Sequence, residues 1–184
     1  MLSRDEALKL VTKYNEGRHH IRHMIAVEAI MRELAKFLGK DENKWGLVGL
    51  LHDLDFEQTY HDIRKHGVVS AEILSGIILK DEINSILAHN FENTGVNPSS
   101  DMDVALIAAD AVSGFIIATA LVTPTKRLRD VSLKTLIRKF RDKNFARGSN
   151  RDRIKISVEL GLPVEDFFSL SLQALQKIAD HLQL

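Results

Sequence analysis

The sequence predicts an all-α protein, and three observations support this prediction. Apolar residues recur at spacings of three and four along almost the whole chain, which is the pattern of helices with one buried face. The 184 residues include only 3 prolines and 10 glycines, so helix-breaking residues are scarce. No alternation of apolar and polar residues, which would indicate a strand, lasts more than a few residues. A chain of this length is most often one domain, so we expect a single helical unit over residues 1–184.

The first three expected helices are marked by residues that start or end helices. Ser3 and Glu6 have the spacing of a capping box, which predicts a helix start. Gly17 and Gly39 lie on either side of a long amphipathic stretch, and Asp41 is a typical N-cap residue. The expected helices cover about residues 3–14, 19–37 and 41–54.

The middle of the chain alternates between polar loops and apolar helices. Residues 55–65 are polar and are expected to form a loop, after which His66 opens the next helix. Asp81 starts a short helix, and Asp101 is expected to cap a long and very apolar one. A second loop is expected near 93–100. The expected helices cover about residues 66–77, 81–90 and 101–122.

The C-terminal third is expected to contain three more helices. Pro124 ends the preceding apolar helix, and Pro163 fits the first turn of the last helix. The expected helices cover about residues 132–141, 149–160 and 163–182.

Charge is distributed unevenly, although the formal net charge is +0. Residues 124–155 contain 12 Lys or Arg and 3 Asp or Glu, whereas residues 1–123 contain 12 basic and 18 acidic residues. A basic segment of this kind suggests an anionic partner, either a phosphorylated substrate or a nucleic acid bound through 124–155. A solvated basic helix face is an equally good interpretation.

Composition excludes some kinds of site and compartment. The chain has no cysteine, which excludes disulfides, thiolate metal sites and a cysteine nucleophile. No apolar run follows the N-terminus, so we expect no signal peptide and a cytoplasmic location. The apolar stretch 104–122 has one charge, Asp110, near its middle. A central Asp costs about 2.5–3.5 kcal/mol in a bilayer, so we expect a core helix and no membrane span.

Six histidine and aspartate residues, each on or beside an apolar helix, form the candidate metal site. Burial of an unpaired imidazole or carboxylate costs several kcal/mol, and a cation removes this cost. Nitrogen and oxygen donors suit Fe, Mn, Zn, Co or Ni. Six donors exceed what one ion with open positions needs, whereas two ions about 3.5–4 Å apart would use them all. The six residues are His23, His52, Asp53, His66, His89 and Asp110.

The order of these residues resembles the HD superfamily of metal-dependent phosphohydrolases, and more narrowly its HDIG-like branch. A single histidine on a helix is more often a core or surface residue than a ligand, so the resemblance depends on the whole order. It covers about residues 18–123. The strings that carry it are His23-Met24-Ile25-Ala26-Val27-Glu28, Leu50-Leu51-His52-Asp53-Leu54-Asp55, Lys65-His66-Gly67, Ala88-His89-Asn90 and Ala108-Ala109-Asp110-Ala111.

The resemblance implies an HD-domain helical bundle, with a metal-binding core over about 18–123 and extra helices over about 124–184. It implies that one metal is bound by His23, His52, Asp53 and Asp110. It also implies that Asp53 bridges to a second metal, which His66 and His89 hold. Asp53 and His52 would then be the catalytic residues.

The chain departs from the branch at two points. The usual His-Asp-Ile-Gly is His52-Asp53-Leu54-Asp55 here, so the following loop is expected to differ, and Asp55 is a candidate partner of a metal ligand. There is no downstream Gly-Tyr-Pro, so the resemblance does not support a cyclic-dinucleotide phosphodiesterase of that subtype.

Three residues are candidate substrate-binding groups. Lys126 and Arg127 follow the helix that carries Asp110, and a cation favours the developing charge of phosphoryl transfer. His20 precedes His23 by about one helical turn and is a third candidate, although its place at a polar helix start favours an exposed position.

The function that the resemblance implies is hydrolysis of a small phosphoester or phosphoanhydride, such as a nucleotide, by a metal-bound hydroxide. The cofactor would be one or two divalent transition metal ions. Two alternatives remain open. HD-fold di-iron oxygenases use the same ligand order, and a non-catalytic sensor or binding module could keep a metal for stability. The sequence does not predict an oligomeric state.

Overall fold

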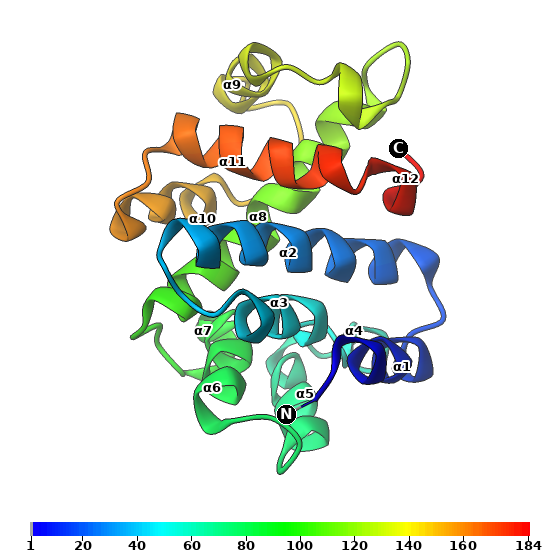
Figure 1. Ribbon diagram of the computed structural model, residues 1–184, viewed down its shortest axis with the longest axis vertical. Coiled ribbons are helices and arrows are strands. Elements are labelled where there is room, and N and C mark those ends of the chain that lie inside the picture. The colour runs from blue at the N-terminus through cyan, green and yellow to red at the C-terminus, as the bar shows by residue number, and fades with distance from the viewer. Residues whose placement is uncertain (1) are drawn as a thin grey trace.

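Helices form the regular structure of residues 2–184, which the computed structural model describes (Figure 1). No strand occurs among these residues, so the predicted all-α class is confirmed. The longer helices are α1 (Arg4–Tyr14), α2 (Arg18–Phe37), α3 (Glu42–Leu51), α5 (Val68–Leu74), α6 (Lys80–Ala88), α8 (Asp101–Leu121), α9 (Leu133–Arg141) and α11 (Val164–Lys177). The shorter ones are α4 (Phe56–Thr59), α7 (Phe91–Thr94), α10 (Arg151–Lys155), α12 (Ala179–Leu182) and the 3-10 helices η1 (Ile63–Lys65), η2 (Leu128–Asp130) and η3 (Ile156–Leu160).

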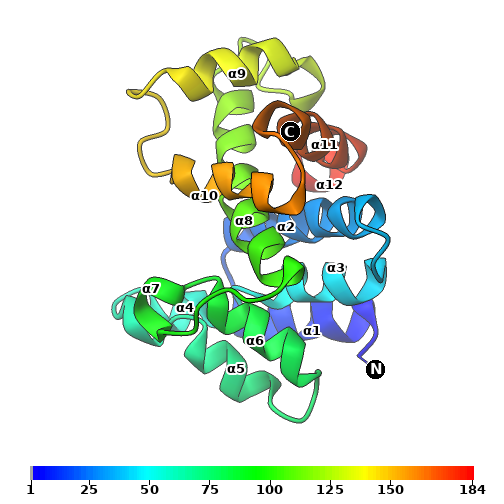
Figure 2. The ribbon, with the colours of Figure 1, turned by 90° about the vertical axis from the view of Figure 1, so that its left-hand side faces the viewer.

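Helices α2 and α8 lie at the centre of the bundle and contact most of the other helices. Helix α2 packs against α3, α8 and α11, and α8 also packs against α6, α9 and α10. In Figure 2, α8 runs along the length of the molecule, with α1 and α4 to α7 at one end and α9 to α12 at the other. The C-terminal helices therefore continue the same core.

The tightest helix pair, α2 with α3, depends on a glycine. A Cβ added to Gly49 of α3 would lie 3.0 Å from the backbone of Glu28 in α2. Glu28 is itself buried, and its carboxylate lies 2.7 Å from Arg4 Nε and 3.0 Å from Arg32 Nη2. This pairing connects α1 to the core and compensates the buried charge of Glu28.

Helix α8 is long and apolar enough to cross a membrane, but 61% of its most apolar window is buried inside the protein. Its Phe115 is fully buried and packs on three phenylalanine rings of the C-terminal helices and the loop after α9. The ring centroids are 5.8 Å from Phe140, 5.6 Å from Phe145 and 5.6 Å from Phe168. Burial in this core accounts for the apolar sequence of α8.

The caps of the first helices agree with the sequence prediction, and later boundaries differ. Ser3 and Glu6 form the predicted capping box, and Asp41 caps α3 through the amides of Asn43 and Lys44. The predicted Asp101 cap is wrong. Ser100 caps α8 instead, because its hydroxyl accepts a hydrogen bond from the amide of Asp103.

Two further predicted segments differ from the structure. Residues 55–65 contain α4 and η1 rather than only a loop, and the last helix divides at Ile178 into α11 and α12. His66 does not open a helix: its backbone is extended and α5 begins at Val68. The cause is the carboxylate of Asp55, which binds the amides of Gly67 and Ser70.

Candidate metal centre

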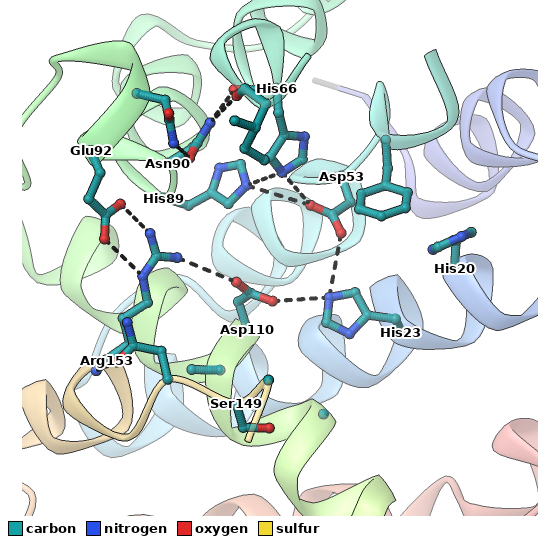
Figure 3. A pocket seen from close by; sticks show the side chains of 17 residues that line it. His20, His23, Asp53, His66, His89, Asn90, Glu92, Asp110, Ser149 and Arg153 are labelled. Carbon is teal, nitrogen blue, oxygen red and sulfur yellow. Dashed lines mark hydrogen bonds and ion pairs between the residues drawn. The ribbon is translucent and has the colours of Figure 1, made fainter. Parts of the chain in front are cut away.

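The six predicted residues come from five separate parts of the chain and meet at one place (Figure 3). His23 lies on α2, and His52 and Asp53 follow the last turn of α3. His66 precedes α5, His89 follows α6 and Asp110 lies in the middle of α8. Five of them line a cavity of about 700 Å³, and His52 lies fully buried behind it.

Asp53 lies at the centre of the group. Its Oδ1 atom is 3.2 Å from His52 Nε2, 3.2 Å from His66 Nε2 and 3.5 Å from His89 Nε2. Its Oδ2 atom is 3.5 Å from His23 Nε2. One carboxylate therefore contacts all four imidazoles.

The donor atoms form two groups that share Asp53. In each group the possible ligand atoms lie within 4.8 Å of one another. The first group is His23, His52 and Asp53, and the second is Asp53, His66 and His89. Asp110 adds to the first group, because its Oδ1 is 3.1 Å from His23 Nε2 and 3.9 Å from His52 Nε2.

All four histidines turn the same ring nitrogen toward Asp53. Each Nδ1 lies against a protein acceptor, so in a neutral ring the hydrogen-bond network assigns the proton to Nδ1 and leaves the Nε2 lone pair directed inward. The acceptors are Gly49 O at 2.8 Å from His52, Ser113 Oγ at 3.1 Å from His23, Asp55 Oδ1 at 2.9 Å from His66, and the carbonyl oxygen of Ile86 for His89.

The inward nitrogens fit a divalent metal ion. His52 Nε2 is buried and has no hydrogen-bond partner among the described residues. His66 Nε2 and His89 Nε2 are 3.0 Å apart, so two lone pairs face each other when both rings are neutral. A cation would give His52 Nε2 the partner that it lacks and would accept the two facing lone pairs of His66 and His89.

The pKa shifts of the site residues show the same demand for positive charge. Burial opposes ionisation of Asp53, yet His52, His66 and His89 together hold the pKa of its carboxyl well below its usual value. Burial also opposes protonation of His66, but hydrogen bonds to Asp53 and Asp55 outweigh it and raise the pKa of His66 to about 10. Burial lowers the pKa of His52 to about 4. A proton on His66 therefore supplies the positive charge that the pocket favours.

Asp55 orients His66, as the sequence suggested. Its side chain is fully buried, accepts from His66 Nδ1 at 2.9 Å and binds the amides of Gly67 and Ser70. Gly67 completes the turn with a φ of 85°, and an added Cβ would lie 3.1 Å from Ile86 O. The turn thus needs glycine for its backbone angle and for its close approach to α6.

We expect Asp55→Asn to weaken metal binding about 10–100-fold, which is typical when the partner of a metal-bound histidine is lost. An amide cannot accept from His66 Nδ1 and from the amides of Gly67 and Ser70 as a carboxylate does. Metal titration of the purified variant checks this, with Asp62→Asn as a control, because Asp62 pairs with Arg64 outside the cavity. Equal affinities of Asp55→Asn and wild type would contradict the orienting role.

The structure separates the three predicted substrate-binding residues. His20 lines the cavity, with its ring stacked on Phe56 at 4.3 Å between centroids. Lys126 and Arg127 do not line it, so the structure does not bring them beside the six histidine and aspartate residues. They border a different hollow beside Asp180, because α8 continues for eleven residues beyond Asp110, about 16 Å along the helix axis.

Two residues of the site were missed in the sequence. Ser113 accepts from His23 Nδ1 and donates to Asp110 O. It could have been found as a polar residue three positions after Asp110 in an apolar helix, and therefore on the same face. Arg153 lines the cavity from α10, and no local pattern distinguishes it from the other basic residues of 124–155.

Part of the chain is similar in sequence to known proteins. Ribonuclease Y of Thermosipho melanesiensis is 36% identical over 107 residues, which are 58% of this chain and 20% of that protein. Ribonuclease Y of Oleidesulfovibrio alaskensis is 32% identical over 109 residues, again 58% of this chain and 20% of that protein. The matches thus cover about a fifth of the length of these curated relatives. No solved structure gives a significant match.

The matching region coincides with the helices that carry the six residues. A family model described as HD domain matches residues 21–114, which is half of the chain. This stretch begins just before His23 and ends just after Asp110. The chain therefore belongs to the HD-domain family.

Proposed function

We propose that the protein is a metal-dependent phosphohydrolase that acts on a phosphoester or phosphoanhydride, with a nucleotide as the substrate. The observation that carries this proposal is the convergence of four Nε2 atoms and two carboxylates, with five of these six residues on one wall of a cavity and His52 buried behind it. Membership of the HD-domain family supports a metal-dependent hydrolase in general.

The two donor groups would hold two ions, with Asp53 shared between them. His23, His52 and Asp110 complete the first group, and His66 and His89 complete the second. A divalent metal in these positions supplies Lewis-acid activation of water and neutralises phosphate charge. The chain itself fixes the ring orientations through Nδ1 and keeps His52 away from solvent.

The cavity is compatible with a nucleotide. Its volume of about 700 Å³ lies in the range of small-molecule sites, roughly 300–1,000 Å³. The aromatic rings of His20 and Phe56 line one side of the cavity. Gly114 of α8 also lines the cavity and has no side chain, and an added Cβ there would meet no atom within 4 Å. A planar base has room here beside the donor wall.

An RNA phosphodiester is a second candidate substrate. The relatives named Ribonuclease Y favour it, together with the 12 basic residues of 124–155. The affinity for RNA bound along this segment should fall steeply with rising salt concentration, because each contact to a phosphate releases counterions when the complex forms. A flat salt dependence of RNA affinity would exclude this mode.

Metal analysis and parallel activity assays on one sample test the proposal. Protein purified without oxygen is analysed for Fe, Mn, Zn, Co and Ni, then screened for phosphate release from nucleotides, for RNA cleavage and for oxygen uptake. We expect about two ions per chain, as in two-metal sites, with phosphoester hydrolysis. Oxygen uptake without hydrolysis would show an oxygenase instead, and a metal without any turnover would show a binding module.

Metal binding should release protons at neutral pH. Hydrogen bonds to Asp53 and Asp55 raise the pKa of His66 to about 10, so its ring is protonated at pH 7 and must lose a proton to bind a metal. His52, with a pKa of about 4, is already neutral. Apparent metal affinity should therefore rise about tenfold per pH unit for each displaced proton as pH increases toward 10.

Calorimetry in buffers of different ionisation enthalpy measures this release. We expect at least one proton per chain for the wild type and fewer for His66→Ala. A proton count that is zero in the wild type, or unchanged in the variant, would contradict the assignment.

A further inference from the structure

Arg153 is the one Lys or Arg side chain among the described residues that line the cavity. It comes from α10, outside the residues 21–114 that match the HD domain, and only 19% of its side chain is exposed. Figure 3 shows it across the cavity from Asp53 and His23, with Asp110 between them. The C-terminal helices thus place one cation opposite the donor wall.

Three neighbours hold the guanidinium in this place. Arg153 Nε is 3.3 Å from Glu92 Oε1, and Nη2 binds the other oxygen of the same carboxylate. The guanidinium carbon lies 5.6 Å from the centroid of the Phe91 ring. Nη1 lies 3.9 Å from Asp110 Oδ2, which is too long for a hydrogen bond. The N–H groups of Nη1 are therefore not hydrogen-bonded to Asp110 and can donate to another acceptor.

The carboxylate of Asp110 connects Arg153 to the metal centre. Its Oδ1 is 3.1 Å from His23 Nε2, while Oδ2 faces Arg153. A cation held by His23 and Asp110 would compensate the charge of this carboxylate and weaken its attraction for Arg153. The guanidinium would then be more available to another anion.

Three carboxylates on the cavity wall disfavour the binding of an anion, and Arg153 offsets this repulsion. The lining includes Asp53, Glu92 and Asp110, which repel a phosphate, and Arg153 is the side chain there that can bind phosphate oxygens in a fork of parallel hydrogen bonds. Glu92 competes with a phosphate for the guanidinium of Arg153. Because 46% of the Glu92 side chain is exposed, water can solvate its carboxylate when Arg153 leaves it, at a small cost in free energy.

We propose that Arg153 binds a non-bridging phosphate oxygen of the substrate, and that this phosphate displaces Glu92, which pairs with Arg153 in the free protein. This inference rests on the proposed phosphohydrolase function and specifies how the substrate is recognised. It makes the C-terminal extension part of the active site, with a substrate class defined by an anionic phosphate next to the metal centre.

The test compares two arginines that each lose one charge. Arg153→Gln removes the cavity cation, and Arg129→Gln is the matched control, because Arg129 pairs with exposed Asp180 outside the cavity. Calorimetry with inorganic phosphate on the metal-loaded proteins gives a binding readout, and KM for the best nucleotide substrate gives a second. We expect Arg153→Gln to weaken both about 10–100-fold, as for a hydrogen bond to a charged group, and Arg129→Gln to change neither.

Two further variants keep the test decisive if Arg153→Gln fails to fold. Arg153→Lys keeps the charge but not the fork, so phosphate binding should weaken less than in Arg153→Gln. Glu92→Gln removes the competitor, so phosphate should bind about two- to fivefold more tightly. Metal content should stay at the wild-type value in every variant.

The inference is overturned if Arg153→Gln binds phosphate as the wild type does, or if Glu92→Gln weakens phosphate binding. A wild-type protein that binds phosphate through Arg153 but hydrolyses no phosphoester would contradict the proposed function and leave the binding site in place. Hydrolysis that persists unchanged in Arg153→Gln would contradict the inference alone.

Discussion

Asp53→Ala is expected to lose bound metal and hydrolytic activity together. Asp53 is the one side chain in contact with all four histidines, at 3.2–3.5 Å from their Nε2 atoms. Its removal takes a ligand from both donor groups and leaves Asp110 as the only carboxylate of the first group. We expect metal affinity to fall by more than the roughly 10–100-fold that loss of an outer partner causes. Activity should fall at least about a thousandfold, as when an essential group of a hydrolase is removed.

His66→Ala provides the comparison that tests the shared position of Asp53. His66 contributes one nitrogen to the second group only, so its loss should cost less metal than the loss of Asp53. Asp180→Ala is the control, because Asp180 is 85% exposed and remote from the cavity. Metal content after dialysis, measured by elemental analysis, ranks the three variants. Equal losses for Asp53→Ala and His66→Ala, or a larger loss for His66→Ala, would contradict the bridging role.

Phe115→Ala should have the largest effect on stability. Phe115 is fully buried and its ring contacts Phe140, Phe145 and Phe168, while the guanidinium of Arg151 lies 5.5 Å from its centroid. Removal of a buried phenylalanine leaves a cavity and typically costs about 3–5 kcal/mol in the free energy of unfolding. The loss should be near the upper end, because four neighbours lose contacts at once.

Chemical denaturation of Phe115→Ala also tests whether the chain is one domain. If the C-terminal helices share the core of α8, the wild type should unfold in a single transition that shifts as a whole in the variant. Phe37→Ala is the matched control, because Phe37 is 52% exposed, and it should change stability by no more than about 0.5 kcal/mol. Two separate transitions, with only one sensitive to Phe115, would show that residues 124–184 fold as their own unit.

Much of the fold was predictable because its signals are local. The capping box of Ser3 and Glu6 and the Asp41 cap involve residues within one helical turn, and short-range hydrogen bonds decide them. A predicted helix boundary was wrong where a residue distant in the sequence forms hydrogen bonds with the start of the helix. Asp55 binds amides 12 and 15 residues away, and it moves the start of α5 beyond His66.

The candidate ligands could also be named from the sequence, because their order along the chain resembles a family pattern. Their role stays a prediction, whereas their convergence is observed. The sequence could not give the orientation of the rings. The partner of His23 is Ser113, 90 residues away, and only the packing of α2 on α8 brings the two together.

The sequence by itself determined the helical class and most helix positions, and it named six candidate donor residues. Only the tertiary structure decided which basic residue faces the cavity. Lys126 and Arg127 are close to Asp110 along the chain, yet the straight path of α8 carries them away from it. Arg153 is 43 positions from Asp110 and returns to it through the turn into α10, where Glu92, 61 residues away, holds it. The physical reason is that each residue of a helix lies about 1.5 Å further along the helix axis, so residues several turns apart in one helix are far apart in space. Which residues face the same cavity therefore depends on how the helices pack against one another.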